Sequence, residues 1–217
     1  MKRKTFTLVE ILVVIGVIAI LMGILFPALG TIREKASHRQ SLAEAKAIHM
    51  AVKSFKNEYS YLPDSATGND VVYYGTVAKG TTTTTDKKCG DVFKMDESLQ
   101  TDYLDLFNTL CYSNSDPTKN SVPPDGSKTL NPKKTKFLTP GKNFIHAEAG
   151  KRGYRDPWGR PYIIMLDTNY DGKIELPGGK VIYDDVAVIG IGTFDFGTSD
   201  KLTDALKKPE QLVTSWQ

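Results

Sequence analysis

The feature that most constrains this chain is a run of apolar residues near its start. Between Ile11 and Ile32 there is no charged residue, and most positions are Ile, Leu, Val, Ala, Gly, Met or Phe. As a helix, these roughly 22 residues would extend about 33 Å, which matches the hydrocarbon core of a bilayer. The run therefore predicts a membrane-spanning helix, although the 217-residue chain as a whole has 40% hydrophobic and 24% charged residues, like a soluble protein.

The basic residues ahead of the run are Lys2, Arg3 and Lys4, and they account for the whole formal net charge of +3, since 3 − 3 = 0 without them. No Lys/Arg field remains to neutralise phosphates, so a nucleic-acid binder is not expected. A secretory signal peptide would need a shorter apolar core. A signal anchor with its basic head in the cytoplasm fits better. Glu10 suits neither interpretation, because a carboxylate in an apolar segment is costly unless it is paired.

Residues 2–15, Lys-Arg-Lys-Thr-Phe-Thr-Leu-Val-Glu-Ile-Leu-Val-Val-Ile, resemble the leader and N-terminal helix of type IV pilins and type II secretion pseudopilins. The resemblance implies that a prepilin peptidase cuts between Thr5 and Phe6 and methylates the new amine of Phe6. The family usually has Gly where this chain has Thr5. Glu10 would meet the Phe6 amine of a neighbouring subunit, because hydrocarbon tolerates these charges only as a pair. Pro27 lacks an N–H for the helix and predicts a kink or local melting, or a harmless bend.

The resemblance also implies a fold, a role and a location. We expect an α+β fold in which a long N-terminal helix packs on a C-terminal antiparallel sheet. The role that the resemblance implies is a structural subunit of a type II secretion pseudopilus. The alternatives are a type IV pilin for adhesion, motility or DNA uptake, and a membrane-anchored extracytoplasmic binding module. The implied partners are further copies of the chain, minor pseudopilins, the peptidase, the inner-membrane assembly platform and lipid. The protein would cross the bacterial inner membrane once, with its head outside, before entering a periplasmic or extracellular filament.

The helix is predicted to continue beyond the apolar run. Apolar residues recur at three- and four-residue steps from Ile32 to Tyr59, and Leu62-Pro63 ends the pattern. A second helix is expected near 97–112, a hairpin near 71–74 and a long exposed connection over 113–140. The expected divisions are a leader at 1–5, an assembly half of the helix at 6–30, an amphipathic half at 31–62, a loop-rich insertion at 63–153, and a sheet head with its tail at 154–217.

The C-terminal third predicts an antiparallel meander. Short strands are expected at 162–166, 173–176, 181–183 and 186–191, after a turn fixed by Asp156-Pro-Trp-Gly-Arg-Pro-Tyr162. That turn, followed by such strands, resembles the head of the major pseudopilin of type II secretion.

A loop between two of these strands has the spacing of a calcium site. Oxygen-bearing side chains alternate at Asp167, Asn169 and Asp171, and Gly172 lets Lys173 offer its carbonyl, as in the first half of a calcium loop. Glu175 would add a carboxylate, whereas the twelfth position is a glycine. A hairpin turn explains the same residues without a metal. In the resembled family calcium binds in a later loop, which corresponds here to Asp195 and Asp200.

The chain has two cysteines, Cys89 and Cys111. Outside the cytoplasm they would form a disulfide, and the alternative is two buried free thiols. An enzyme is not expected. The three histidines lie in the long helix and in a loop, and they form no nucleophile–base set. The glycines near 190–197 have the wrong spacing for a dinucleotide loop.

Overall fold

A computed structural model describes residues 7–63, 71–73, 80–81, 101–111, 131–139, 154–176, 179–194 and 205–216. The chain forms two compact units, Met1–Arg39 and Gln40–Gln217, which we describe separately. The long helix α1 (Leu8–Tyr59) belongs to both units. Its bounds confirm the single helix expected from the apolar and amphipathic patterns.

In the second unit, α1 ends as the sequence predicted. Ser60 takes a left-handed backbone with φ of 63°, and its N–H donates to the Lys56 carbonyl at 2.7 Å. Leu62 then turns back into the core and is fully buried. Pro63, which has no N–H to donate, follows it and cannot continue a helix.

The head is built on a five-stranded antiparallel sheet in the order β2-β1-β3-β6-β7. Its strands are β1 (Val71–Tyr73), β2 (Gly80–Thr81), β3 (Ile163–Leu166), β6 (Val186–Gly190) and β7 (Val213–Thr214). In the central pair, Ile163 lies opposite Ile189 and Leu166 opposite Val186. The helix α2 (Thr101–Cys111) lies inside the predicted range 97–112.

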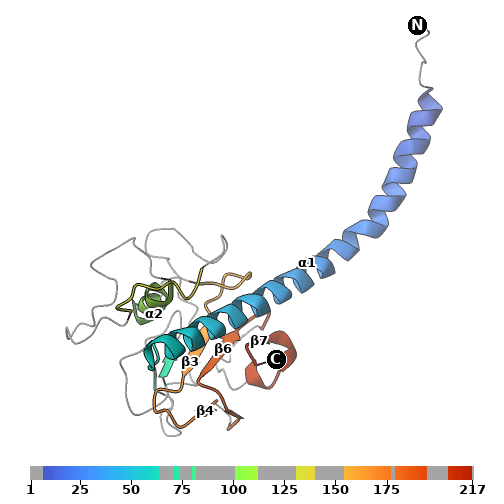
Figure 1. Cartoon of the computed structure of the whole chain (residues 1–217). Helices are drawn as coiled ribbons and strands as arrows, with labels where there is room; N and C mark the ends of the chain where they lie inside the picture. Colours follow the sequence, from blue (N-terminus) through green and yellow to red (C-terminus); the bar gives the residue numbers. More distant parts are fainter. Residues whose placement is uncertain are drawn as a thin grey trace. The chain divides into compact units, whose positions relative to one another are not determined.

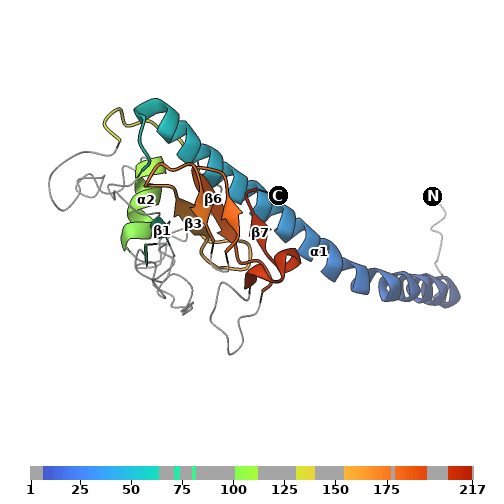
Figure 2. The same cartoon turned by 90° about the horizontal axis from the view of Figure 1, so that it is seen from below.

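Both faces of the sheet are buried. Alternate residues of β3 and β6 point to opposite sides, and each set packs into its own hydrophobic core. Figures 1 and 2 show the C-terminal half of α1 lying along β3, β6 and β7, with α2 beside them. The core on this face contains Ile48, Val52, Phe55, Tyr103, Leu110, Ile164, Leu166 and Val188. The opposite core contains Ile163, Met165, Ile174, Leu176, Ala187, Ile189, Phe194 and Leu212.

The predicted meander is wrong in its connections, although its strands are present. Within the described residues, β4 (Ile174–Glu175) and β5 (Val181–Ile182) pair with each other alone and form a separate two-stranded sheet. The chain leaves the main sheet after β3 and returns directly beside it as β6. A tight turn at Gly179, with φ of 84°, closes this hairpin. Its Ile174 and Ile182 cover the second core, so the hairpin packs on the sheet instead of extending it.

The middle of the chain contributes more to the head than the sequence indicated. β1 and β2 confirm the expected hairpin, and β1 also extends the main sheet by pairing with β3. Residues 131–139 are not simply exposed, because Asn131 and Leu138 are buried. The Asn131 amide donates to the Thr109 carbonyl at 2.9 Å, and its Oδ1 accepts the Tyr59 hydroxyl at 2.6 Å. This segment therefore joins α2 to the end of α1.

Candidate functional site: the N-terminal segment and the loop at the helix end

The first turn of α1 is closed by a reciprocal pair of side chains. The Thr7 N–H and the Thr7 hydroxyl both donate to Oε2 of Glu10 at 2.9 Å, and the Glu10 N–H donates to the Thr7 hydroxyl oxygen at 3.3 Å. This is a capping box, in which N-terminal helical N–H groups gain side-chain acceptors. Sequence reasoning treated Glu10 as unpaired within the chain. The Thr-x-x-Glu spacing was the signal that could have found its partner.

Of the other residues predicted to act in processing and assembly, Thr5 and Phe6 lie outside the described residues. α1 runs through residue 27 without a break, so the local melting expected at Pro27 is not observed. Large apolar side chains on the first half of the helix are exposed, among them Leu8, Ile11, Ile15, Ile20 and Leu25, which are between 51% and 80% exposed. Among the residues described, no helix combines the length and the apolar character needed to cross a membrane.

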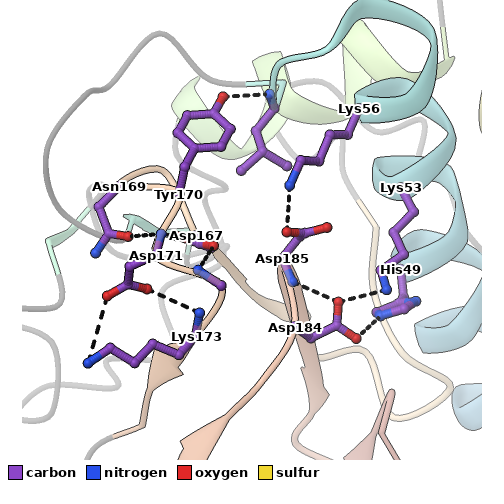
Figure 3. Close-up of polar contacts among 12 residues, drawn as sticks. His49, Lys53, Lys56, Asp167, Asn169, Tyr170, Asp171, Lys173, Asp184 and Asp185 are labelled. Atoms are coloured by element: carbon purple, nitrogen blue, oxygen red, sulfur yellow. Dashed lines mark hydrogen bonds and ion pairs between the residues drawn. The ribbon is translucent and has the colours of Figure 1, made fainter.

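The predicted calcium loop closes on its own backbone (Figure 3). Asp167 is fully buried, and its carboxylate accepts the N–H groups of Asp171 at 3.2 Å and Gly172 at 2.9 Å. Asn169 Oδ1 accepts the Asp171 N–H at 2.8 Å. Tyr170 and Gly172 both have positive φ, of 60° and 78°. In this turn the side-chain oxygens of Asp167 and Asn169 accept backbone N–H groups in place of backbone carbonyls, as in an Asx turn.

The loop's charged side chains also contact one another. Lys173 Nζ lies 3.8 Å from Asp171 Oδ2 and 3.4 Å from Glu175 Oε1. Within the described parts of the chain, no three His, Cys, Asp or Glu side chains are grouped so that they could hold a metal ion. Asp195 and Asp200, the alternative ligands, lie outside those parts. Calcium binding at either loop stays a prediction.

Next to this loop, two acids on the β5–β6 turn hold the end of α1 (Figure 3). Asp184 contacts His49 Nε2 at 3.1 Å and Lys53 Nζ at 2.9 Å, and Asp185 accepts Lys56 Nζ at 2.5 Å. Burial raises the pKa of Asp184, but the hydrogen bonds from Lys53 and His49 outweigh it and lower that pKa. We call Asp184 and Asp185 the helix-anchoring acids. They were missed in the sequence because their partners are more than a hundred residues away.

Tyr170 connects the loop to the same helix end. Its hydroxyl accepts the Leu62 N–H at 3.1 Å, and Lys56 Nζ lies 5.4 Å from the centre of its ring. The backbone N–H of Asp167 also donates to the Asp185 carbonyl at 3.0 Å. The loop is thus a structural support for the helix–head contact, a role that requires no metal.

The N-terminal segment is similar to a known protein family. Residues 1–26 match the family of the prokaryotic N-terminal methylation motif. The match covers Thr5, Phe6 and Glu10, and it supports a type IV pilin-like protein of the prepilin type, with a membrane-anchored place in the cell envelope. It implies peptidase processing and filament assembly in general terms. No curated protein and no solved structure shows a significant match to the chain.

Asp156 stabilises the turn that precedes β3 in the head. This side chain is 4% exposed, and its carboxylate accepts the N–H groups of Trp158 at 3.0 Å, Arg160 at 2.7 Å and Gly192 at 3.3 Å. Gly192 has φ of 61°, and a Cβ there would lie 2.4 Å from the Gln211 carbonyl oxygen. Asp156 therefore links the turn before β3 to the chain after β6.

Tyr162, at the end of that turn, connects the sheet to α1. Its ring is fully buried, its hydroxyl donates to Glu44 Oε2 at 2.6 Å, and Ser41 Oγ lies 3.3 Å from the Tyr162 hydroxyl oxygen. Its backbone N–H donates to the Tyr103 hydroxyl at 3.1 Å. The turn from Asp156 to Tyr162 thus holds both α1 and α2 on this face of the sheet.

Cys111 is a buried free thiol in contact with the Tyr154 hydroxyl. Burial raises the pKa of this thiol to about 11, which keeps it protonated at neutral pH. The disulfide predicted between Cys111 and Cys89 stays a prediction. Cys89 itself lies outside the described residues.

The buried carboxylate of Asp156 predicts a pH dependence of head stability. Burial raises its pKa from 3.8 to about 6, although three backbone N–H groups oppose the change. Between about pH 4 and 6 the unfolded chain loses this proton while the folded head keeps it. The free energy of unfolding should therefore fall by up to about 3 kcal/mol across this window and level off above pH 6.

Urea unfolding of a chain starting at Gln40, measured every half pH unit, checks this dependence. Asp156→Asn should remove that part of the slope, whatever it does to stability at a single pH. An Asp156→Asn chain with the wild-type slope would show that another group is responsible.

Asp167→Ala should destabilise the head without any metal present. The substitution removes the buried Asp167 carboxylate and its two part-buried hydrogen bonds from the N–H groups of Asp171 and Gly172, which costs about 1–3 kcal/mol. Asn169→Ala, which removes one exposed hydrogen bond, is the matched control and should cost less. Thermal unfolding in the presence of a chelator measures both effects.

The same chains test calcium. At ten times the dissociation constant, a bound ion adds about 1.4 kcal/mol to the free energy of unfolding. Extracellular calcium sites bind at ~10⁻⁴–10⁻³ M, so millimolar calcium should raise the wild-type melting temperature and leave Asp167→Ala unchanged. Loss of the increase in Asp195→Ala and Asp200→Ala instead would move the site to the later loop. If wild type does not respond, the loop binds no calcium.

Proposed function

We propose that this protein is a structural subunit of a pilus-like filament, a pseudopilin of a type II secretion system. The observation that carries the proposal is the methylation motif at residues 1–26, joined to a helix whose apolar side chains are exposed. Exposing the apolar side chains between Leu8 and Ile32 to water is unfavourable, so lipid or further copies of the helix are needed to cover them. A subunit stored in the inner membrane and then polymerised uses both environments in turn.

The charges at the helix start give this polymerisation a register. Cleavage after Thr5 creates an amine on Phe6, four residues before the Glu10 carboxylate. The capping box holds that carboxylate at the N-terminal end of α1, where it can accept the amine of a neighbouring copy. A subunit added in the wrong register would leave an unpaired charge among apolar side chains, which is strongly unfavourable.

The choice of a pseudopilin over a type IV pilin rests on the head. The turn from Asp156 to Tyr162 resembles that of major pseudopilins and supports the sheet and both helices here. Minor pseudopilins and an inner-membrane assembly platform would then be the partners. A type IV pilin uses the same N-terminal motif, and the presence of genes for one or the other machinery beside this gene separates the two.

Processing is the direct test of the proposed function. Co-expression with a prepilin peptidase should yield a mature chain that starts at N-methyl-Phe6, as read by mass spectrometry of the intact protein. Phe6→Ala and a peptidase with an inactive catalytic site are the controls. An intact Met1, or a cut at another bond, would remove the prepilin interpretation of Thr5-Phe6.

A further inference from the structure

A group of basic side chains follows the apolar run in the first unit. Arg33, Lys35 and Arg39 are exposed on α1, directly after the charge-free stretch that ends at Ile32. We call these three residues the basic collar. Glu34 is the acid among them, and the half-buried His38 is the other titratable side chain. In the described part of the chain, the structure gives none of the three collar cations an ion-pair partner.

From this arrangement we propose that the basic collar binds the phosphates of anionic lipid headgroups at the outer face of the membrane. The proposal rests on the membrane anchoring contained in the proposed function. α1 is unbroken from Leu8 to Tyr59, so the collar continues directly from the apolar run. Six residues of helix between Arg33 and Arg39 cover about 9 Å, close to the depth of one headgroup layer.

The distribution of the collar around the helix favours lipid over a protein partner. At about 100° per residue, Lys35 and Arg39 lie roughly 200° and 240° from Arg33, on the other side of the helix. A protein partner contacts one side of a helix, whereas lipid headgroups surround it. Two of the three cations are arginines, whose planar fork binds phosphate oxygens in pairs.

Removal of the leader changes which basic residues flank the apolar run. Lys2, Arg3 and Lys4 leave with residues 1–5, so the collar becomes the only basic cluster that flanks the apolar run in the mature chain. Each cation near an anionic membrane surface contributes about a fivefold preference, and Glu34 offsets one of the three. A net preference of up to about 25-fold for anionic over zwitterionic lipid follows, and it should weaken in salt.

The experiment uses the full mature chain in phosphatidylcholine bilayers with a trace of spin-labelled lipid. Electron paramagnetic resonance measures the association of labelled phosphatidylglycerol relative to labelled phosphatidylcholine. The ratio should be several-fold for wild type, fall in 0.5 M NaCl, and approach one for R33Q/K35Q/R39Q. The matched control K46Q/K134Q/K208Q removes three exposed lysines elsewhere and should keep the wild-type ratio.

Five outcomes would overturn the proposal. A wild-type ratio of one shows that the collar does not select lipid, and an equal loss in the control shows a general charge effect. Competition by 10 mM inorganic phosphate, compared with NaCl of equal ionic strength, points to a site for free phosphate. A collar variant that keeps its lipid ratio but no longer forms filaments assigns the collar to subunit contacts. Extraction of wild type by alkaline carbonate overturns the anchoring as well, and thus separates that failure from a failure of the collar.

Discussion

Replacing Glu10 by alanine is expected to lower filament yield by at least about a hundredfold while the head stays folded. The Phe6 amine of each arriving subunit would lose its partner, and breaking a buried ion pair on one side costs about 3–5 kcal/mol. The amount of protein in sheared filaments, relative to the membrane fraction, measures the yield. Thermal unfolding of the head should not change, because Glu10 lies in the first unit.

Two further variants separate the charge of Glu10 from its capping role. Glu10→Gln can keep the capping box with Thr7 but removes the charge, whereas Thr7→Val removes the cap and keeps the charge. Charge pairing requires that Glu10→Gln assembles as poorly as Glu10→Ala and that Thr7→Val is affected less. Normal filament yield from Glu10→Ala and Glu10→Gln would refute the pairing of Glu10 with the Phe6 amine.

Phe55→Ala should be the most destabilising single substitution at the helix–head contact. Phe55 is fully buried, and its ring lies 4.7 Å from Tyr59, 5.7 Å from Tyr61 and 5.2 Å from Phe137, measured between ring centres. Removing a buried phenyl ring costs about 3–5 kcal/mol in lost burial and in the cavity that remains. Because marginally stable domains have only about 5–15 kcal/mol in total, much of the head's stability would be lost.

Urea unfolding of a chain starting at Gln40 measures this loss. Met50→Ala is the matched control on the same helix, because Met50 is 67% exposed and should change stability by no more than about 0.5 kcal/mol. Equal effects of the two substitutions would mean that the aromatic group around Phe55 does not hold the helix on the sheet.

Helices and strands were predictable wherever the spacing of apolar residues distinguishes a helix from a strand. Three- and four-residue steps gave α1 and α2, and short apolar runs gave β3 and β6, because both patterns follow from which side chains must be buried. Strand order was not predictable, since β3 and β6 pair across an excursion that contains the β4–β5 hairpin. β7 is too short to show any alternation and was missed.

The candidate site was predictable only where its chemistry is local. Thr5, Phe6 and Glu10 lie within one short segment, and residues 1–26 match the N-terminal methylation motif, whereas the roles of the three residues stay predictions. The helix-anchoring acids could not be found, because Asp184 meets His49 and Lys53 only after the head has folded. The loop at Asp167 shows a further limit. The same spacing serves a metal or a backbone turn, and the choice depends on which N–H groups the carboxylate accepts in the folded chain.

The order of the strands has a consequence for how such a subunit can diversify. The hairpin β1–β2 forms one edge of the sheet and β7 the other, whereas the central pair β3–β6 faces α1. The β2 edge, at Gly80 and Thr81, is therefore separated by β1 from the pair that carries the helix, and substitutions there can accumulate without altering that surface.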